Sequence, residues 1–447
     1  IFVAICGSAC DGHDYIEQAI SNGAKYIVCQ RTNRTEAEEI VVEDSSKAAA
    51  ILAQASRGNP ARQLTNLAVT GTNGKTTVAY LVHSVIKNAG FKCGLISTIL
   101  YDTCAARSPA TLTSPDCLRL AEMTRRMVSS GAKYMVTEAS SHALVQNRLA
   151  AIDFRAAAFT NLSGDHLDYH KQKENYLAAK MILFETLSAD AAAVLNKQSP
   201  EAREIAKRTN ARIFWYAIGE PADINAQIQS ADARGTVFLL KYKGQQETVK
   251  SSLLGPFNVS NHLAAAGLCL AAGFDLETIA AGLSALRSVP GRLEKVDWNG
   301  DFSVFIDYAH TDDALTNVLS TLKTLCTGKL TVVFGCGGDR DKAKRPRMAK
   351  AAENLADKMI VTSDNPRNEK PLDIIDDIVA GFQNPDSETI IIEADRKKAI
   401  ELAINTAGRN DIVLIAGKGH ETYQIIENQR FDFNDKEIAG QYLRKRK

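Results

Sequence analysis

Short apolar runs alternate along most of this chain with longer segments whose apolar residues recur at helical spacing. The helical spacing is clear in the segment 77–89, where one face collects Val78, Leu81, Val82, Val85 and Ile86. Apolar runs separated by helices are typical of a largely parallel sheet that helices cover. The pattern therefore predicts an α/β protein.

The first stretch, residues 1–62, predicts a small α/β domain. Its apolar runs are Phe2–Ile5, Tyr26–Cys29 and Ile40–Val42, and its helical stretches are Asp14–Asn22 and Ser45–Gln54. The turn-rich sequence Ser56-Arg-Gly-Asn-Pro-Ala61 then marks a linker. Because the chain begins inside an apolar run and without a methionine, we expect its natural N-terminus to lie further upstream.

Two further α/β domains are predicted after the linker. Between residues 63 and 290 the β-like runs are Leu67–Val69, Cys93–Ile99, Tyr134–Thr137, Ala156–Phe159 and Ala192–Leu195. After a break at Val289-Pro-Gly-Arg292, the runs of residues 291–447 are Phe302–Ile306, Leu330–Phe334, Lys358–Val361, Thr389–Ile392 and Asp411–Ile415. Polar or glycine-rich residues follow most of these last runs, at the sheet edge where such folds bind ligands. The pattern thus predicts three domains, 1–62, 63–290 and 291–447, the last one doubly wound.

Composition narrows the range of partners. A length of 447 residues fits about three domains, and 45% hydrophobic with 23% charged residues is ordinary for a soluble globular protein. Lys and Arg number 53 against 52 Asp and Glu, so the net charge of +1 indicates neither a nucleic acid nor a membrane surface as partner. Nine cysteines without a C-x-x-C pair, and no apolar run of the ~18–20 residues that span a bilayer, predict a cytoplasmic protein with reduced thiols.

One glycine-rich loop carries the strongest chemical signal. The sequence Thr70-Gly-Thr-Asn-Gly-Lys-Thr-Thr77 follows an apolar run and opens the helical segment described above. Gly71 and Gly74 let backbone N–H groups turn toward phosphate oxygens. Lys75 adds a cation, and Thr76 can offer its hydroxyl to a magnesium ion. Although a valine stands where the strict P-loop pattern has its first glycine, the strand, loop and helix together predict nucleotide-phosphate binding.

Two groups of polar residues indicate a metal. Glu138 follows the run Tyr134–Thr137, where a P-loop domain places an acid that organises magnesium. Further on, Asn161-Leu-Ser-Gly-Asp-His-Leu-Asp-Tyr-His170 contains two histidines and two aspartates, and His166 with a carboxylate could share one metal. Both signals have a plain alternative: a solvated glutamate on a turn, and side chains that cap helices or fill turns.

Lys180 lies in the middle of a predicted apolar helix face. Its neighbours at helical spacing are Tyr176, Leu177, Leu183 and Phe184. Such a lysine can extend along the apolar surface and reach solvent. Alternatively, its amine is buried with a depressed pKa and reacts with carbon dioxide, which would convert a cation into an anionic metal ligand.

The last domain predicts a site for an anionic ligand. Asp307 and His310 follow one strand and could hold a ribose or a phosphate. A cationic cluster is predicted from Arg340, Lys344 and Arg345. Arg367 follows Pro366, which restricts the backbone, and its planar guanidinium suits a carboxylate ligand.

Taken together, these motifs resemble the Mur ligases. The residues that carry the resemblance are Thr70-Gly-Thr-Asn-Gly-Lys-Thr-Thr77, Glu138-Ala-Ser-Ser-His142, Asn161-Leu-Ser-Gly-Asp-His-Leu-Asp-Tyr-His170, Asp307-Tyr-Ala-His310 and Gly337-Gly-Asp-Arg-Asp-Lys342. The likeness covers nearly the whole chain, and the family's loop also lacks the first P-loop glycine. It implies one domain for the UDP end of a substrate, a central ATPase domain and a Rossmann-like C-terminal domain that brings an amino acid.

The resemblance also implies a reaction. Lys75 and two magnesium ions would align ATP with a substrate carboxylate, and an amine would attack the resulting acyl phosphate. The implied substrates are UDP-MurNAc-L-Ala-D-Glu and meso-diaminopimelate, because the family associates Asp364-Asn-Pro-Arg367 with this amino acid and Arg367 can pair with its second carboxylate. We expect a monomer without nucleic-acid or membrane partners, in which ATP closes a hinge at Pro290-Gly291.

The family's site residues carry over by motif. Nucleotide contacts are implied for Gly71, Thr72, Asn73, Gly74, Lys75, Thr76, Thr77, Asn258, Asn261, His262, Arg292, Asp307 and His310. Magnesium would be organised by Thr76, Glu138, His166 and Lys180, the last as N6-carboxylysine. The UDP-muramoyl substrate would contact Thr113, Ser114, Ser140, Gln146 and Arg148, and the amino acid would contact Arg340, Asp364, Asn365, Pro366, Arg367, Gly417 and Glu421. The implied catalytic residues are Lys75, Glu138, His166 and Lys180.

Two alternative functions stay open on the sequence. A ligase of the folylpolyglutamate synthase type would perform the same chemistry on another acceptor, although Thr113-Ser-Pro and Asp364-Asn-Pro-Arg367 argue against it. A nucleotide-binding module without ligase activity is the other, and loss of Glu138, His166 or Lys180 would have favoured it. A plain P-loop kinase or GTPase gives no reason for the third domain.

Overall fold

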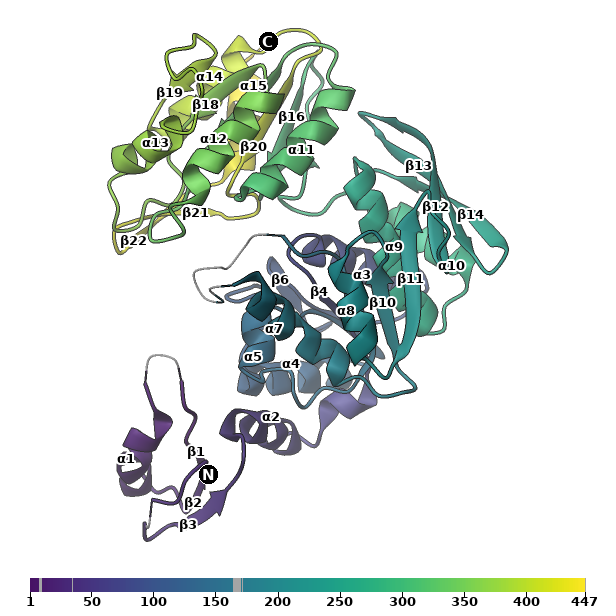
Figure 1. The fold of residues 1–447 in the computed structure, drawn as a ribbon, viewed down its shortest axis with the longest axis vertical. Helices are drawn as coiled ribbons and strands as arrows, with labels where there is room; N and C mark the ends of the chain where they lie inside the picture. Colours follow the sequence, from purple (N-terminus) through teal and green to yellow (C-terminus); the bar gives the residue numbers. More distant parts are fainter. Residues whose placement is uncertain (8–9, 34, 164–169, 171, 447) are drawn as a thin grey trace.

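The computed structural model describes residues 1–7, 10–33, 35–163, 170 and 172–446. It has an α/β architecture of three sheet-containing parts, which Figure 1 shows in chain order from purple through teal to green and yellow. The predicted fold class is therefore confirmed. No helix in these ranges is long and apolar enough to cross a membrane.

The N-terminal part is a small parallel sheet flanked by helices. Its strands are β1 (Phe2–Val3), β2 (Tyr26–Cys29) and β3 (Glu38–Val41), paired in that order. The helices are η1 (Gly12–Tyr15), α1 (Ile16–Ser21), α2 (Ser45–Ala55) and η2 (Pro60–Gln63). Ala4, Ile16, Ile27 and Cys29 form its small apolar core.

An eleven-stranded sheet forms the middle of the molecule, in the order β14-β13-β12-β11-β10-β9-β4-β8-β5-β6-β7. The strands are β4 (Thr65–Thr70), β5 (Cys93–Ile96), β6 (Leu100–Asp102), β7 (Arg107–Pro109), β8 (Tyr134–Glu138), β9 (Phe154–Phe159), β10 (Ala192–Asn196), β11 (Arg212–Ile218), β12 (Ile224–Asp232), β13 (Gly235–Tyr242) and β14 (Gln245–Ser251). Pairing is parallel from β12 to β5, as predicted, and antiparallel strands extend both ends. The β12–β14 meander was not predicted, since β14 carries few apolar residues.

Helices cover both faces of this sheet. One face carries α3 (Lys75–Asn88), α9 (Pro256–Ala271) and α10 (Leu276–Ala285). The other carries α4 (Cys117–Ser129), α5 (Ser141–Val145), α7 (Lys173–Glu185) and α8 (Glu201–Arg208). Because successive strand residues point to opposite faces, Leu67 and Val69 belong to the first core and Ala68 to the second. The helices α3 and α7 thus lie in different layers, with the end of β4 between them.

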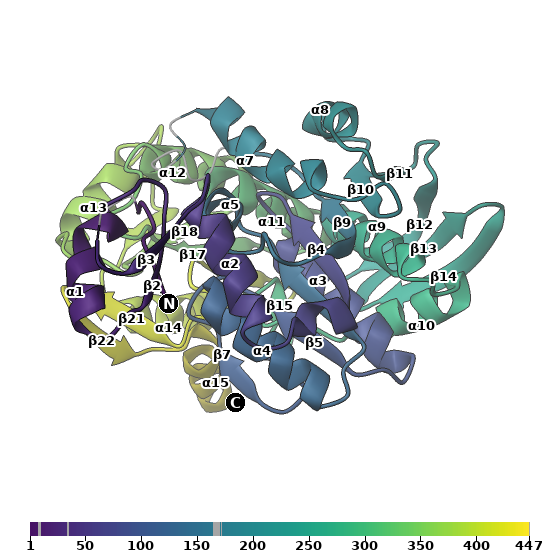
Figure 2. The ribbon, with the colours of Figure 1, turned by 90° about the horizontal axis from the view of Figure 1, so that it is seen from below.

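The C-terminal part is a second doubly wound sheet, in the order β15-β16-β20-β17-β18-β19. The strands are β15 (Glu294–Lys295), β16 (Ser303–Asp307), β17 (Leu330–Phe334), β18 (Lys358–Val361), β19 (Ile390–Ile392) and β20 (Ile412–Ala416). The helices are α11 (Asp312–Leu325), α12 (Lys344–Leu355), α13 (Pro371–Val379), α14 (Arg396–Thr406) and α15 (Asp435–Lys445). A hairpin that was not predicted, β21 (Tyr423–Ile426) and β22 (Gln429–Asp432), follows β20 and is visible beside α14 in Figure 2.

Candidate active site

The phosphate loop joins β4 to α3 in a conformation that requires its glycines. Gly71 and Gly74 have φ angles of 148° and 88°, which side-chain-bearing residues rarely adopt. A Cβ atom at Gly74 would also collide with the side-chain oxygen of Asn261, which lies against the loop. Lys75 Nζ donates to the carbonyl oxygens of Gly71 (2.9 Å) and Thr72 (2.7 Å), so the loop is closed around its own lysine.

Glu138 is a fully buried carboxylate at the end of β8. Its Oε2 accepts a hydrogen bond from Thr76 Oγ1 at 3.1 Å. Thr98 donates to both carboxylate oxygens, through its backbone nitrogen to Oε1 (2.8 Å) and through its hydroxyl to Oε2 (3.0 Å). The alternative of a solvated glutamate on a turn is therefore wrong, and Glu138 is fixed beside the hydroxyl that P-loops offer to magnesium.

Lys180 of α7 is buried with its amine beside the phosphate loop. Its exposed fraction is 1%, and Nζ donates to the carbonyl oxygen of Gly71 at 2.9 Å. The same atom lies 4.1 Å from the ring centre of Tyr176. The alternative in which this lysine reaches solvent is therefore wrong. A cavity of about 180 Å³ is lined by Lys180 together with Thr72, Asn73, Gly74, Lys75, Thr76, Thr77, Thr98, Thr113, Glu138, Ser140 and Arg292.

The histidine-rich segment is described only in part. His166, a predicted catalytic residue and metal ligand, lies outside the described residues. His170 is described and buried, with Nε2 hydrogen-bonded to Ser141 Oγ at 2.9 Å. It therefore joins the start of α5 to the segment that leads into α7.

Arg292 connects the linker between the central and C-terminal sheets to the phosphate loop. Its Nη2 donates to Thr76 Oγ1 at 3.1 Å, and its guanidinium carbon lies 4.6 Å from the ring centre of Tyr308. Asp307 next to it is buried and accepts hydrogen bonds from the backbone nitrogens of Leu293 and Ala309. Burial raises the pKa of the Asp307 carboxyl, and Arg292 and the two N–H groups lower it.

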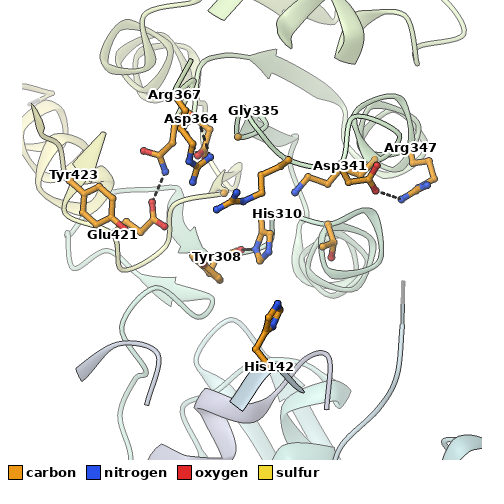
Figure 3. A pocket seen from close by; sticks show the side chains of 16 residues that line it. His142, Tyr308, His310, Gly335, Asp341, Arg347, Asp364, Arg367, Glu421 and Tyr423 are labelled. Atoms are coloured by element: carbon orange, nitrogen blue, oxygen red, sulfur yellow. Dashed lines mark hydrogen bonds and ion pairs between the residues drawn. The ribbon is translucent and has the colours of Figure 1, made fainter. Parts of the chain in front are cut away.

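A larger cavity of about 520 Å³ lies at the carboxyl ends of the C-terminal strands (Figure 3). It is lined by the predicted residues His310, Arg340, Asp364, Asn365, Arg367, Gly417 and Glu421. Figure 3 shows His142 facing His310 across this cavity from the central part. Tyr308 and His310 line both cavities, so these two residues lie where the phosphate-loop cavity and the C-terminal cavity meet.

Arg367 is held at the cavity wall by its backbone and its side chain. Its φ of 51° lies in the left-handed region, and its N–H donates to Ile425 O at 3.1 Å in the β21–β22 hairpin. Its Nη1 donates to Gly338 O at 2.8 Å. The hairpin that was absent from the prediction therefore positions the arginine that the sequence singled out.

The predicted cationic cluster is only partly correct. Arg345 is fully buried and pairs with Glu369 (2.8 Å) and Asp377 (2.8 Å), so it stabilises α12 and cannot reach a ligand in this cavity. Arg340 and Lys344 do line the cavity. Arg347 was missed and lines it as well, one helical turn after Lys344.

The remaining predicted residues divide into two groups. Ser114 Oγ donates to Glu138 O (2.7 Å), and Arg148 donates to Ser114 O (2.9 Å) and to Gln146 Oε1 (2.6 Å), which joins these residues to the Glu138 turn. Asn258, Asn261 and His262 are buried in α9 and line neither cavity. Their role at a nucleotide stays a prediction.

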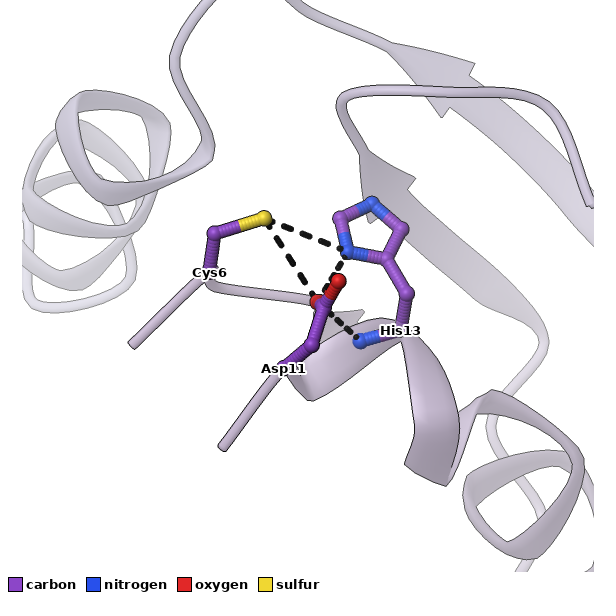
Figure 4. Close-up of side chains that lie close together, drawn as sticks. All are labelled: Cys6, Asp11 and His13. Carbon is purple, nitrogen blue, oxygen red and sulfur yellow. Dashed lines mark hydrogen bonds and ion pairs between the residues drawn. The ribbon is translucent and has the colours of Figure 1, made fainter. Parts of the chain in front are cut away.

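A separate cluster of Cys6, Asp11 and His13 lies in the N-terminal part (Figure 4). His13 Nε2 accepts a hydrogen bond from Gln30 N at 3.1 Å, so the proton of the neutral ring is on Nδ1 and is donated to Asp11 Oδ1 at 2.7 Å. A metal can bind Nδ1 only if the Nδ1 proton is lost. Because Nε2 accepts a hydrogen bond and carries no proton, the ring would then have to become an anion. The cluster therefore acts as a turn that is closed by hydrogen bonds.

Fold and site together define a nucleotide-dependent ligase architecture, and comparison with known proteins agrees. Residues 69–269 match the family model "Mur ligase middle domain", residues 291–419 "Mur ligase, glutamate ligase domain", and residues 1–62 "Mur ligase family, catalytic domain". This chain belongs to the Mur ligase family.

Among its relatives are two proteins named UDP-N-acetylmuramoyl-L-alanyl-D-glutamate–2,6-diaminopimelate ligase. The one from Bacillus licheniformis is 43% identical over 446 residues, 98% of this chain and 91% of the relative. The one from Geobacillus kaustophilus is 42% identical over 452 residues, 100% of this chain and 92% of the relative. A solved structure of an enzyme with the same name is similar with a TM-score of 0.70 and 33% identity, covering 97% of this chain and 90% of that one.

Folylpolyglutamate synthase from Mycobacterium tuberculosis, solved with ADP, shares the fold with a TM-score of 0.69. Its identity of 20%, over 83% of this chain and 92% of that one, shows the fold alone.

Proposed function

We propose that this chain is an ATP-dependent ligase that adds meso-diaminopimelate to the D-glutamate of UDP-MurNAc-L-Ala-D-Glu. The observation that carries the proposal is the meeting of two cavities at Tyr308 and His310. One contains the phosphate loop, and the other contains the Asp364-Asn-Pro-Arg367 segment. A phosphate donor and an amine donor can therefore approach one carboxylate from opposite sides. The names of relatives at 42–43% identity support the same substrates.

When ATP binds, hydrogen bonds within the phosphate loop would be replaced by hydrogen bonds to the ATP phosphates. In this structure Lys75 Nζ donates to two carbonyl oxygens of its own loop. Phosphate oxygens carry more charge than carbonyls and would attract this ammonium group toward the γ-phosphate. The N–H groups at the start of α3 would bind the other phosphate oxygens.

The phosphate-loop cavity fits a magnesium site. Thr76 and Glu138 present oxygen donors, which this cation prefers, and His166 and N6-carboxylated Lys180 complete the proposed ligands. Bound magnesium would neutralise charge on the phosphates and align the γ-phosphate with the attacking oxygen. A carbamate on Lys180 would replace an ammonium group by an anion. The anion would form beside the phosphate loop, because Lys180 Nζ lies 2.9 Å from the carbonyl oxygen of Gly71.

The proposed reaction has two steps, phosphoryl transfer and amide formation, and in each step one bond forms while another breaks. A γ-carboxylate oxygen of D-glutamate attacks the γ-phosphorus, the bond to the β,γ-bridging oxygen breaks, and ADP leaves. The amine nitrogen of diaminopimelate, having lost a proton, attacks the carbonyl carbon of the acyl phosphate. The tetrahedral intermediate collapses, the C–O bond to phosphate breaks, and the amide remains.

Contacts between the central and C-terminal parts would protect the acyl phosphate from water. Arg292 already bonds Thr76 across the linker, and we propose that ATP closes the cavities further around Pro290-Gly291. We also propose that the protein acts in the cytoplasm as a monomer. The monomer is supported by the residues that line both cavities, all of which come from a single chain.

Phosphate release with ATP and UDP-MurNAc-L-Ala-D-Glu tests the proposal when meso-diaminopimelate, L-lysine and L-ornithine are offered in parallel. Release with diaminopimelate alone is expected, because only this amino acid has a second carboxylate for Arg367. Equal rates with lysine would overturn the role of Arg367. Release with none of them, together with tight ATP binding, would favour a binding module. Release with a reduced folate and glutamate would favour the folylpolyglutamate synthase alternative.

A further inference from the structure

Lys418 is a fully buried lysine directly behind the C-terminal cavity. Gly417 and Gly419 flank it with φ angles of 113° and 53°, so the chain turns sharply after β20 and directs the lysine inward. Its Nζ donates to Asn365 Oδ1 at 3.1 Å and to Glu421 Oε2 at 3.2 Å. Asn365 and Glu421 line the cavity, and Lys418 contacts both of them from the protein side.

These hydrogen bonds determine how the Asn365 amide is oriented. Its Oδ1 accepts from Lys418 Nζ and from Ile425 N (3.0 Å), while its Nδ2 donates to Glu421 Oε2 at 2.8 Å. A flipped amide would place its NH2 group against two donors and its oxygen against a carboxylate. Lys418 and the Ile425 N–H group together therefore fix which end of Asn365 meets Glu421.

Lys418 also compensates negative charge at this wall. The Glu421 side chain is only 16% exposed, and the buried Asp364 lies on the neighbouring loop, where its Oδ2 approaches Gly417. Burying two carboxylates without a cation is costly, whereas a buried and hydrogen-bonded ammonium offsets one of them. The pair of carboxylates can then receive the positively charged amino group of an incoming ligand.

We propose that Lys418 is a positioning residue of the amino-acid site, which orients the Asn365 amide and holds the Glu421 carboxylate for the amino group of the substrate. This inference rests on the proposed function, since it assigns the C-terminal cavity to the amino acid. Lys418 itself lies behind the wall and is not among the residues that line the cavity. Its effect is therefore expected on amino-acid binding and not on the nucleotide.

The test compares Lys418→Met with a matched control, Lys323→Met, in the complete chain. Lys323 lies in the same part on α11 and pairs with Asp357 at 2.6 Å near the surface. Loss of a buried charged hydrogen-bond partner should raise the KM for meso-diaminopimelate at least ~10-fold, with KM for ATP and for the UDP substrate changed less than ~2-fold. The control should change none of them. If Lys418→Met does not fold, the same measurements are made on Lys418→Gln.

A double-mutant cycle separates positioning from general structural damage. If Lys418 acts through the amide, adding Lys418→Met to Asn365→Ala should raise the KM for the amino acid by a factor at least ~2-fold smaller than Lys418→Met does in the wild type, because only the contact with Glu421 is then left to lose. Independent, multiplying effects would overturn the proposal. So would an unchanged KM for the amino acid, or a parallel loss in all three KM values and kcat.

The pH dependence gives a second readout. Burial raises the pKa of the Glu421 carboxyl, Lys418 and Asn365 lower it, and Asp364 raises it. Further charged or titratable side chains that interact with Glu421 are Tyr308, Arg396 and Tyr423. In Lys418→Met the acid limb of 1/KM for the amino acid should move up by about one pH unit or more, because a favourable cation is lost. An unmoved limb would contradict the inference.

The two proposals fail in different ways. If the wild-type chain releases no phosphate with meso-diaminopimelate, the proposed function fails and the role of Lys418 is overturned with it. If the wild-type chain is active and Lys418→Met behaves like Lys323→Met, only the role of Lys418 is overturned.

Discussion

Asn73 of the phosphate loop is hydrogen-bonded to Asp313 of the C-terminal part. Its Nδ2 donates to Asp313 Oδ2 at 3.0 Å, across 240 positions of sequence. Asp313 lies in the first turn of α11, which is capped by Thr311. The contact directly couples the position of the C-terminal part to the loop that would bind ATP.

We expect Asp313→Ala to loosen this coupling. The variant leaves Asn73 without its carboxylate partner, so the unliganded protein should sample more open arrangements and show a larger radius of gyration in X-ray scattering. The kcat/KM for ATP should fall by about 10-fold or more, because a hydrogen bond to a charged group contributes about 1.5–3 kcal/mol. Asp312→Ala is the matched control for scattering, because Asp312 bonds Arg347 within its own part (3.2 Å). An unchanged radius of gyration would refute the coupling.

Lys180→Ala should nearly abolish ligation. Removing the proposed anionic ligand from beside Gly71 should lower kcat by about 10²–10³-fold, with partial restoration by added formate or acetate. Lys173→Ala is the control on the same helix, since Lys173 pairs with Glu201 at 2.7 Å near the surface. Mass spectrometry under native conditions should detect one carbon dioxide adduct in the wild type that Lys180→Ala lacks. Wild-type rates in Lys180→Ala would end the carbamate proposal.

Buried histidines should make the protein less stable in mild acid. Burial lowers the pKa of His262 to about 4, and that of His83 to about 4 as well. Below pH ~6.5 an unfolded chain takes up protons that the folded chain refuses until pH ~4. The free energy of unfolding should therefore be highest above pH ~6.5 and fall by up to ~1.4 kcal/mol per pH unit for each histidine down to pH ~4.

Urea unfolding at several pH values checks this expectation. His262→Gln can still donate to Asn258 O, which His262 Nδ1 now contacts at 2.6 Å, but it cannot titrate. Between pH 6.5 and 4 the free energy of unfolding of this variant should change less per pH unit than that of the wild type. The difference in slope should correspond to up to about one bound proton. Identical slopes for the variant and the wild type would contradict the assignment.

The ion pair of Arg396 and Asp435 should contribute strongly to stability. Both side chains are fully buried, and the guanidinium meets the carboxylate through two hydrogen bonds of 2.9 and 2.7 Å that join α14 to α15. Asp435→Ala leaves a buried cation uncompensated and should lower the free energy of unfolding by about 3–5 kcal/mol. Glu204→Ala, which breaks an exposed pair with Lys207, should cost at most about 1 kcal/mol. Similar losses in the two variants would be inconsistent with this view.

Features encoded within one helix or one loop could be predicted from the sequence. The phosphate loop is a continuous strand, glycine turn and helix, so Gly71, Gly74 and Lys75 were recognisable without tertiary information. Helical periodicity placed Lys180 on an apolar helix face, because its neighbours one turn away are apolar, but it left open whether the amine is buried. The parallel strands in the middle of the central sheet could also be predicted, because apolar runs and helical segments alternate along the sequence.

Features that depend on distant partners could not be predicted. Arg345 looked like one member of a basic cluster, but its charge is neutralised by Glu369 and Asp377, which lie 24 and 32 positions away. The β21–β22 hairpin has no strong apolar alternation, yet it positions Arg367. Lys418 was not singled out either, because Asn365 reaches it only through the folding of two loops 53 positions apart.

The sequence by itself determined the α/β architecture, the phosphate loop, the acidic residue at the end of β8 and the resemblance to the Mur ligases, since these reside in short continuous patterns. Only the tertiary structure decided that Tyr308 and His310 join two cavities, that Arg345 is structural, and that Lys418 supports Asn365 and Glu421. The physical reason is that burial and charge pairing depend on which segments meet in space. Local patterns specify elements, whereas a site with two substrates depends on how the elements pack.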